Sequence, residues 1–199
     1  MFILKSIIDQ YCNMKDGRVF ACFVDFQKAF DKVIHTGILI KLLDIGVSCR
    51  FYNIIKNMYK QTKYCVKIEN KLTNFFESRL GMKQGDNLSP NLFKIFINSL
   101  PDYLEKTNDP ISIEDKSIHC LMYADDIVLL SKSSQGLQEK LNKLKDICND
   151  WCLNINIKKT KVLVFNKAGK HISQKFLYGN QELECVSRYK YLGIQFTSS

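Results

Sequence analysis

The sequence predicts an α+β fold, and three stretches carry that prediction. The run Val19 to Phe26 is β-branched and aromatic, which favours a buried central strand. The stretch Ile118 to Leu130, reading IHCLMYADDIVLL, predicts two short strands joined by a turn at Ala124 to Asp126, because aspartate suits turns. A longer apolar stripe at helical spacing predicts a helix packed on the sheet: Leu137, Leu141, Leu144, Ile147 and Trp151.

The first half of the chain supplies further helices and a hairpin. Ile3 to Tyr11 has the apolar spacing of a short amphipathic helix. Apolar residues Ile38 to Leu43 predict a helix that stops at Gly46, and Ser48 is suited to cap the next helix. Two more strands are predicted at Tyr64 to Glu69 and Asn74 to Leu80, with a turn around Asn70-Lys71.

The second half is predicted from similar signals. Ser89 is a suitable N-cap and Pro90 fits the first position of a helix that runs to Leu100. We interpret Asn108 to Lys116 as an exposed connection. An apolar run follows at Val162 to Phe165, and short strands are then predicted at three places: Phe176 to Tyr178, Glu182 to Val186 and Tyr189 to Phe196.

Composition excludes several classes of protein. The chain has 199 residues, of which 46% are hydrophobic and 25% charged, which is ordinary globular usage and excludes a disordered chain. No stretch approaches the roughly 20 apolar residues of a membrane span, and the start resembles no secretion signal. The eight cysteines include no CxxC pair, and Cys148 and Cys152 fit an apolar helix face better than a zinc site. We therefore expect reduced thiols, no membrane and an intracellular protein, in the nucleus or the cytoplasm.

The positive charge is concentrated in one segment. The net charge is +9, and between Lys132 and Lys175 ten lysines stand against three acids, so this segment alone carries 10 − 3 = +7. Most of these lysines are expected to be solvated on a helix face. Their summed field nevertheless attracts phosphate backbones, which indicates nucleic acid as the partner.

Three aspartates are the candidate catalytic residues. Asp125 and Asp126 lie between apolar runs, where an ionised carboxylate costs several kcal/mol unless something compensates its charge. On spacing alone, an ordinary hairpin with a solvated turn is an equal alternative to a Mg²⁺ site. Asp25, near the end of the first predicted strand, favours the metal site. Three carboxylates from two strands can hold two divalent ions about 3.5–4 Å apart, an arrangement that promotes phosphoryl transfer.

Five motifs in series resemble one family. They are FVDFQKAFD (Phe23 to Asp31), GMKQGDNLSPNLF (Gly81 to Phe93), YADD (Tyr123 to Asp126), LNINIKKTKVLVF (Leu153 to Phe165) and YKYLGIQF (Tyr189 to Phe196). In this order, the motifs resemble the reverse transcriptase domain of non-LTR (LINE-type) retrotransposons. The resemblance implies a polymerase palm-type antiparallel sheet backed by helices, with partial fingers and no thumb.

The resemblance also implies an activity and its cofactor. The expected enzyme is an RNA-directed DNA polymerase, a nucleotidyltransferase that joins a dNTP to the 3′ end of a DNA primer on an RNA template. Asp25, Asp125 and Asp126 are implied to be both the catalytic residues and the ligands of two Mg²⁺ ions, with Mn²⁺ as an alternative.

Further residues take roles by resemblance alone. Phe26, Phe30, Gln84, Gly85, Lys159 and Lys161 are implied to face the nucleotide. Phe30 resembles a steric gate against the ribose 2′-hydroxyl, although by itself it reads as a core aromatic. Asn156 and Lys159 are expected to shape a nucleotide-facing loop, and one lysine of the Lys158 to Lys161 cluster to protonate the leaving pyrophosphate. The Leu192-Gly193 turn is implied to grip the primer.

The resemblance assigns residues 1–199 to a single domain fragment. Its palm core would cover about 18–165 and its primer-grip strands about 176–196. Because family polymerases have more finger sequence and a helical thumb, we expect part of a larger retrotransposon polyprotein or a shortened element copy, whose activity in isolation stays open. Two alternatives remain: a non-catalytic nucleic-acid-binding remnant, and a related palm enzyme such as an intron maturase or an RNA-templated RNA polymerase.

Overall fold

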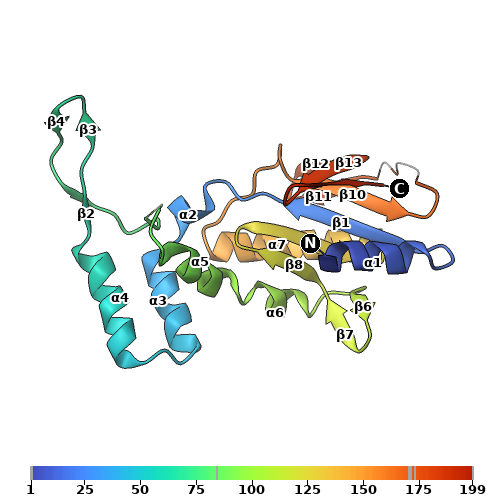
Figure 1. Ribbon diagram of the computed structural model, residues 1–199, viewed down its shortest axis with the longest axis horizontal. Helices are drawn as coiled ribbons and strands as arrows, with labels where there is room; N and C mark the ends of the chain where they lie inside the picture. The colour runs from blue at the N-terminus through green and yellow to red at the C-terminus, as the bar shows by residue number, and fades with distance from the viewer. Residues whose placement is uncertain (1, 84, 170–171, 173, 199) are drawn as a thin grey trace. The chain divides into compact units, whose positions relative to one another are not determined.

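The computed structural model describes residues 2–83, 85–169, 172 and 174–198. The chain divides into two compact units, one made of Met1–Gln27 with Ser99–Ser199, and one of Lys28–Asn98. The larger unit therefore takes both ends of the chain, and the smaller unit is inserted between them (Figure 1). Within the described residues, no helix combines the length and the apolarity needed to cross a membrane.

A six-stranded sheet forms the centre of the larger unit. Its strand order is β11-β12-β10-β1-β9-β8, and all neighbours are antiparallel except β10 and β12. The strands are β1 (Arg18–Val24), β8 (Cys120–Tyr123), β9 (Asp126–Ser131), β10 (Lys161–Asn166), β11 (Phe176–Tyr178) and β12 (Gln181–Cys185). Strand β1 lies between β9 and β10, and six of its seven residues are buried. The predicted central strand is thus confirmed, ending at Val24, one residue before Asp25.

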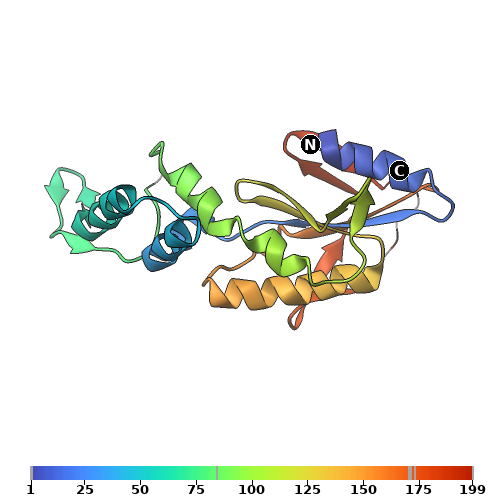
Figure 2. The same ribbon diagram turned by 90° about the horizontal axis from the view of Figure 1, so that it is seen from below.

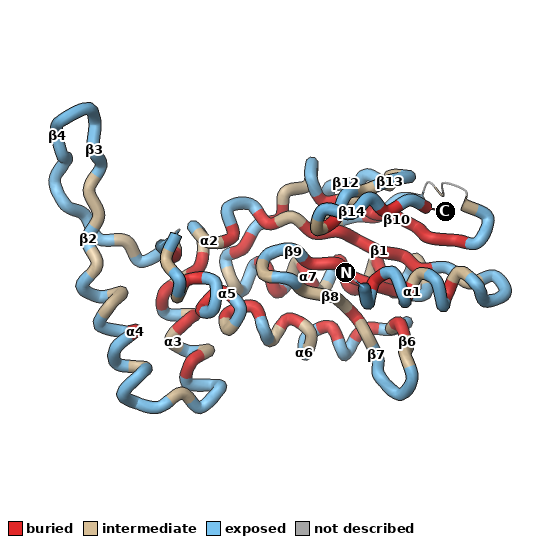
Figure 3. The backbone as a smooth tube through the Cα atoms, viewed as in Figure 1, coloured by how far each residue is buried: buried red, intermediate tan, exposed pale blue. Residues whose placement is uncertain are grey.

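Different elements cover the two faces of this sheet. Helix α7 (Ser134–Asp150) packs on one face through the predicted apolar stripe, and Ser133 caps it by accepting a hydrogen bond from the Gly136 N–H at 3.0 Å. Helix α1 (Phe2–Cys12) lies on the other face (Figure 2). The buried strands of the centre stand out in Figure 3. The α+β class predicted from the sequence is confirmed.

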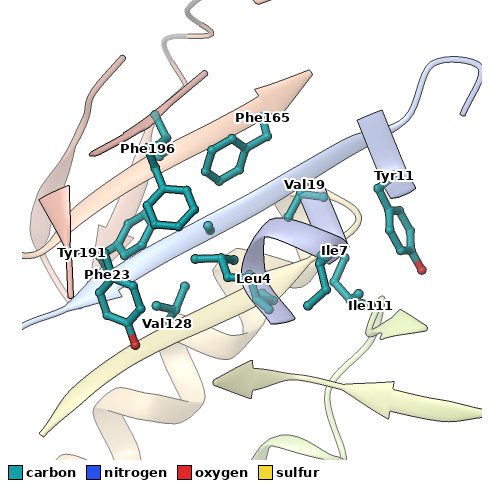
Figure 4. Packing of buried hydrophobic residues seen from close by; sticks show 13 residues of the cluster. Leu4, Ile7, Tyr11, Val19, Phe23, Ile111, Val128, Phe165, Tyr191 and Phe196 are labelled. Carbon is teal, nitrogen blue, oxygen red and sulfur yellow. The ribbon is translucent and has the colours of Figure 1, made fainter. Parts of the chain in front are cut away.

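The face below α1 holds an aromatic cluster. The ring of Phe23 stacks on that of Tyr189, with centroids 4.6 Å apart. The centroid of the Phe23 ring also lies 5.3 Å from that of Tyr191, and both of these residues belong to the buried cluster in Figure 4. Both tyrosines come from β13 (Arg188–Tyr191), which pairs with β14 (Ile194–Thr197) in a two-stranded sheet. The predicted strand Tyr189 to Phe196 is therefore a hairpin, with its turn at Leu192-Gly193. This hairpin covers the same face as α1 because Phe23, Tyr191 and Phe196 share one buried cluster.

The stretch Asn108 to Lys116 is largely exposed, as predicted, but it is more than a connection because it forms most of a hairpin. Ile111 is fully buried at the start of β6 (Ile111–Ile113), which pairs with β7 (Lys116–Ile118). A short helix, α6 (Leu100–Leu104), precedes it. The polar residues around Ile111 hide its role: the Tyr11 hydroxyl bonds the backbone of Ser112, and this ties the hairpin to α1.

The smaller unit contains four helices and a hairpin. The helices are α2 (Ala29–Lys32), α3 (His35–Asp44), α4 (Cys49–Gln61) and α5 (Ser89–Ile97). Ser48 caps α4 as predicted, by accepting from the Phe51 N–H at 3.5 Å. Ser89 does not cap α5: Leu88 is the cap residue, Ser89 is buried as the first helical residue, and the Asp86 side chain accepts the Leu88 N–H at 3.0 Å. That carboxylate orients the residue before the helix.

The predicted hairpin between residues 64 and 80 is shorter and interrupted. It consists of β2 (Lys63–Tyr64) with β5 (Phe76–Glu77), and β3 (Lys67–Ile68) with β4 (Lys71–Leu72). Its residues are mostly exposed, so no buried face fixes a long register. Tyr64 and Phe76, whose ring centroids are 6.1 Å apart, hold its base.

Candidate active site

The three predicted aspartates lie at the same end of the central sheet of the larger unit. Val24 pairs with Ile127 across β1 and β9, so continuing this register by one residue sets Asp25 opposite Asp126. Directly opposed residues of antiparallel strands have Cα atoms about 4.5–5.5 Å apart. Because side chains alternate along a strand, these two share the face of Phe23 and Val128. Asp125 follows immediately, in the turn before β9.

A tight turn presents the acidic pair. Tyr123 pairs with Asp126, so Ala124 and Asp125 are the two turn residues. Ala124 has a φ of 54°, the left-handed region that favours glycine, and such strained residues are common at functional sites. The predicted two-strand hairpin is confirmed, and its turn leaves both Asp125 and Asp126 exposed.

The backbone of Asp25 is held by a segment far along the chain. Its N–H donates to the Thr160 hydroxyl at 3.2 Å, and its carbonyl accepts the Asn156 N–H at 2.7 Å. Thr160 is fully buried, which makes its hydroxyl a fixed partner. Next to it, Phe26 bridges to Ile155 and is itself 8% exposed. Phe26 therefore belongs to the buried core next to Asp25, a position that its place in the sequence did not indicate.

The electrostatics agree with this geometry. Partial burial raises the pKa of Asp126 above its usual range, and the charges of Asp125 and Asp25 raise it further. Each additional negative charge disfavours ionisation of a neighbouring carboxyl. The charges of Asp25 and Asp125 thus act on Asp126, although Asp25 is distant from the other two in the sequence.

Tyr189 and Tyr191 also lie at this site, and the sequence analysis did not assign them a role there. Burial raises the pKa of Tyr189, with the charges of Asp25 and Asp126 adding to the effect, and the pKa of Tyr191 rises to about 12. The Tyr189 hydroxyl donates to the Lys159 carbonyl at 3.5 Å. The available signal was their two-residue spacing, which sets both on one face of a strand.

The two candidate general acids differ in their surroundings. Lys161 makes an ion pair with Glu184 at 2.5 Å, and its side chain is 18% exposed. Lys159 is exposed, and its carbonyl is bonded to Tyr189. An ammonium already engaged by a carboxylate is less available to donate a proton, so the structure favours Lys159.

The other predicted nucleotide-facing residues belong to the smaller unit. The ring of Phe30 stacks on Phe93 of α5 with centroids 4.7 Å apart. Gly85 has a φ of 81° and open space where a Cβ would stand. Gln84 lies outside the described residues.

The turn predicted to grip the primer is a two-residue connection between β13 and β14. Leu192 has a φ of 46° and Gly193 a φ of 84°, as in the type I′ turns that suit tight hairpins. A Cβ at Gly193 would meet no atom within 4 Å. The backbone conformation, rather than close approach within this chain, accounts for the glycine.

Comparison with known proteins shows which family the chain belongs to. The family described as "Reverse transcriptase (RNA-dependent DNA polymerase)" matches residues 3–196. The chain belongs to this family. The match covers Asp25, the YADD turn and the Leu192-Gly193 turn, so all three lie inside the reverse transcriptase region.

Relatives of this chain include proteins of mobile elements. It is 30% identical to a "Probable RNA-directed DNA polymerase from transposon BS" of Drosophila melanogaster over 96% of the chain. It is 28% identical to the Pol polyprotein of the R2 element of Nasonia vitripennis over 98% of the chain, and 29% identical to the polymerase of the mobile element jockey of Drosophila funebris over 87%. The predicted resemblance to non-LTR reverse transcriptases is confirmed. The chain spans only 19–21% of the length of these relatives.

A solved structure supports the fold. The apo telomerase of Candida tropicalis, truncated from the C-terminal domain, superposes with a TM-score of 0.63 at 13% identity, over 99% of this chain and 37% of the other. At this identity the likeness concerns the fold alone, and it agrees with a palm-type sheet.

Reverse transcriptases generally use divalent metal ions, and the three aspartates are the candidate ligands in this chain. Within the described part of the chain, no three or more His, Cys, Asp or Glu side chains form a group that could hold a metal ion. The donors nevertheless fit in kind, because carboxylate oxygens are the ligands that Mg²⁺ prefers. Asp25 and Asp125 repel the charge of Asp126, and a bound cation would relieve this repulsion.

Proposed function

We propose that this chain is the catalytic part of an RNA-directed DNA polymerase of a non-LTR retrotransposon. The single observation that carries the proposal is the end of the β1–β9 pairing at Val24 and Ile127, which leaves Asp25 near Asp126, with Asp125 in the adjoining turn. Family membership and the relatives named above support the same reaction. The proposed substrates are a dNTP, an RNA template and a DNA primer, and a larger polyprotein is the proposed context.

In the proposed reaction, the primer 3′-oxygen attacks the α-phosphorus of the dNTP. The bond from this phosphorus to the oxygen of the β-phosphate breaks, and pyrophosphate leaves. Asp25, Asp125 and Asp126 would hold two Mg²⁺ ions, or Mn²⁺ in their place. When bound, such ions activate the attacking oxygen and neutralise charge on the phosphates. The protein contributes mainly position and electrostatic stabilisation.

Residues around the aspartates have supporting roles in this proposal. Asn156 and Thr160 fix the backbone of Asp25 through their hydrogen bonds. Lys159 gives a proton to the leaving pyrophosphate, whereas Lys161 stays paired with Glu184. Phe26 packs in the core next to Asp25. Phe30, Gln84 and Gly85 contact the nucleotide, as the family resemblance implies. The Leu192-Gly193 turn contacts the primer on the same grounds.

Asp125→Asn tests the function directly. We expect extension of oligo(dT) on poly(rA) to fall by orders of magnitude, because the amide loses the charge that holds the cation. Folding is expected to be intact, since Asp125 is an exposed turn residue. Asp115→Asn, in the exposed turn of the β6–β7 hairpin, is the matched control.

A second measurement keeps the test independent of turnover. Mg²⁺ with dTTP should raise the melting temperature of the parent and of Asp115→Asn but not of Asp125→Asn. Equal extension rates in parent and Asp125→Asn, or equal thermal shifts, would rule the function out. Nucleic-acid binding that is salt-sensitive yet unaffected by Mg²⁺, with no extension, would instead favour the non-catalytic binding protein, which the +7 segment also supports.

A further inference from the structure

A polar hollow opens beside α7, and the proposed chemistry does not use it. Its volume is about 410 Å³, within the range of small-ligand pockets. Its walls come from α7, the residues before β10, the β11–β12 hairpin and Gln27 after β1, all within the larger unit. Five carboxamides line it: Gln27, Asn149, Asn154, Asn156 and Gln181.

The charge of the hollow has one sign. Lys145 and Lys158 line it, and no carboxylate does. Neither lysine makes an ion pair among the described residues, where the ammonium groups of Lys161 and Lys175 are the ones paired with glutamates. A Cβ built at Gly179 would collide with the Lys145 ammonium, so that ammonium lies against the turn of the hairpin. Both cations belong to the +7 segment, which thus gains a specific location.

We infer that this hollow binds the phosphate backbone of an unpaired RNA segment, a site separate from the aspartates. Lysine ammonium groups bind phosphates as point charges, and carboxamides both donate and accept hydrogen bonds. The Watson–Crick and Hoogsteen edges of the bases meet such amides only where the strand is unpaired, because pairing occupies the first edge and the deep, narrow major groove of a duplex hides the second. The choice of RNA rests on the proposed function, and the lysine–phosphate chemistry does not.

The hollow adjoins the support of Asp25. Asn156 lines it and also donates its N–H to the Asp25 carbonyl at 2.7 Å, and the Gln27 N–H donates to the Asn154 carbonyl at 2.7 Å. Substituting Asn156 would therefore disturb both sites. Lys145, Lys158 and Gln181 line the hollow without making these backbone bonds, so they are the residues to change.

Lys145→Gln combined with Lys158→Gln tests the inference. The probe is a fluorescent 12-nucleotide single-stranded RNA, titrated without Mg²⁺ or dNTP so that catalysis has no part in the result. Loss of two phosphate contacts should reduce the slope of log K against log salt by about 1.4 and weaken binding ~25-fold at 0.1 M salt. Lys143→Gln with Lys167→Gln removes the same charge outside the hollow and should leave the slope close to that of the parent.

Gln181→Ala supplies a second variant that keeps every charge. It should weaken binding of the single strand without changing the salt slope, because an amide displaces no counterions. With the corresponding RNA duplex, the two lysine pairs should behave alike. Equal affinity and equal slopes of the two lysine pairs on single-stranded RNA would overturn the inference. This result is independent of the proposed function, since failure of Asp125→Asn to lower extension leaves the binding data unchanged.

Discussion

Asp126 is a carboxylate held where two others repel it. Its raised pKa means that the protonated form is favoured in the folded state relative to the unfolded chain. This contribution to stability is present at low pH and is lost as the pH rises through the raised pKa. At neutral pH, Asp126 therefore destabilises the fold.

Asp126→Asn should make the protein more stable at pH 7. The gain should be on the order of a few tenths of a kcal/mol, because solvent screens an exposed group. Urea unfolding at pH 7 and at pH 4 measures it, and the difference from the parent should shrink at the lower pH. Mg²⁺ should stabilise the parent more than the variant. A variant less stable than the parent at pH 7 would contradict the repulsion.

Phe30→Val separates two roles of one ring. If Phe30 excludes the ribose 2′-hydroxyl, the variant should incorporate ribonucleotides more readily in primer extension. It should also lose about 1 kcal/mol or more of stability, since Phe30 stacks on Phe93. Phe93→Leu is the control: it removes the same stacking from the other side and should leave the dNTP/rNTP ratio unchanged. A similar ratio in both variants would exclude the gate.

Charged residues beside apolar runs were the ones proposed from sequence. Two acids between apolar runs, and a third at the end of a strand, were chosen because charge there needs a reason, although the structure leaves Asp125 and Asp126 exposed at a turn. Tyr189 and Tyr191 were not recognised, because a tyrosine suits a strand for ordinary reasons. Their closeness to Asp25 and Asp126 depends on how β13 packs over Phe23, which local sequence does not encode.

The hairpin of β8 and β9 depends on an alanine in a glycine-type conformation. Ala124→Gly should relieve the strain of its positive φ and stabilise the fold by up to about 1 kcal/mol, after the larger chain entropy of glycine is subtracted. Thermal unfolding measures this. Extension should fall at the same time if the alanine rigidifies the turn that carries Asp125. A loss of stability would show that the alanine side chain makes a packing contact outweighing the strain.

Elements with a buried face were predicted better than elements without one. The apolar stripe of α7 and the apolar run of β1 are visible in the sequence because each buries a regular set of apolar residues. The β6–β7 hairpin was missed because Ile111 is a lone buried residue among polar neighbours. Ser89 was assigned to the cap by its type, yet Leu88 occupies that position, because the Asp86 side chain orients the preceding turn.

Lys140 makes the free energy of unfolding vary with pH in the alkaline range. It is fully buried and donates to the Asn108 carbonyl at 2.6 Å, and burial lowers its pKa to about 8. At Lys140 the unfolded chain therefore binds more protons than the folded one above pH 8, so the contribution of this lysine to stability rises with pH, whereas buried thiols such as Cys148, whose pKa is raised to about 11, act in the opposite direction. Between pH 8 and 10 the rise should be on the order of 2 kcal/mol.

Lys140→Met removes this dependence. Denaturant unfolding at pH 8, 9 and 10 should show the parent gaining stability relative to the variant as the pH rises. Lys143→Met, on the same helix, is the control that should follow the parent. Parallel profiles of parent and Lys140→Met would show that the buried lysine stays charged through this range.

At the scale of the whole chain, motif order predicted more than composition did. Composition limited the chain to a globular protein of mixed class, whereas five motifs in series identified the reverse transcriptase family and its sheet. Neither indicated that the chain divides into two compact units or that an amide-lined hollow lies beside α7. Both features depend on how distant segments fold together.

The hydrogen bond between Asp25 and Thr160 also bears on how the molecule is made. Strand β1 is synthesised well before its partners β9 and β10: Phe20 pairs with Ser131 and Phe23 with Lys161. Such long-range pairing folds slowly, because the intervening loop must close before the contacts reward it. A nascent polypeptide released before residue 160 lacks the hydroxyl that receives the Asp25 amide. Copies that end between residues 126 and 160 would thus carry all three candidate carboxylates and still lack the hydroxyl that holds the Asp25 amide.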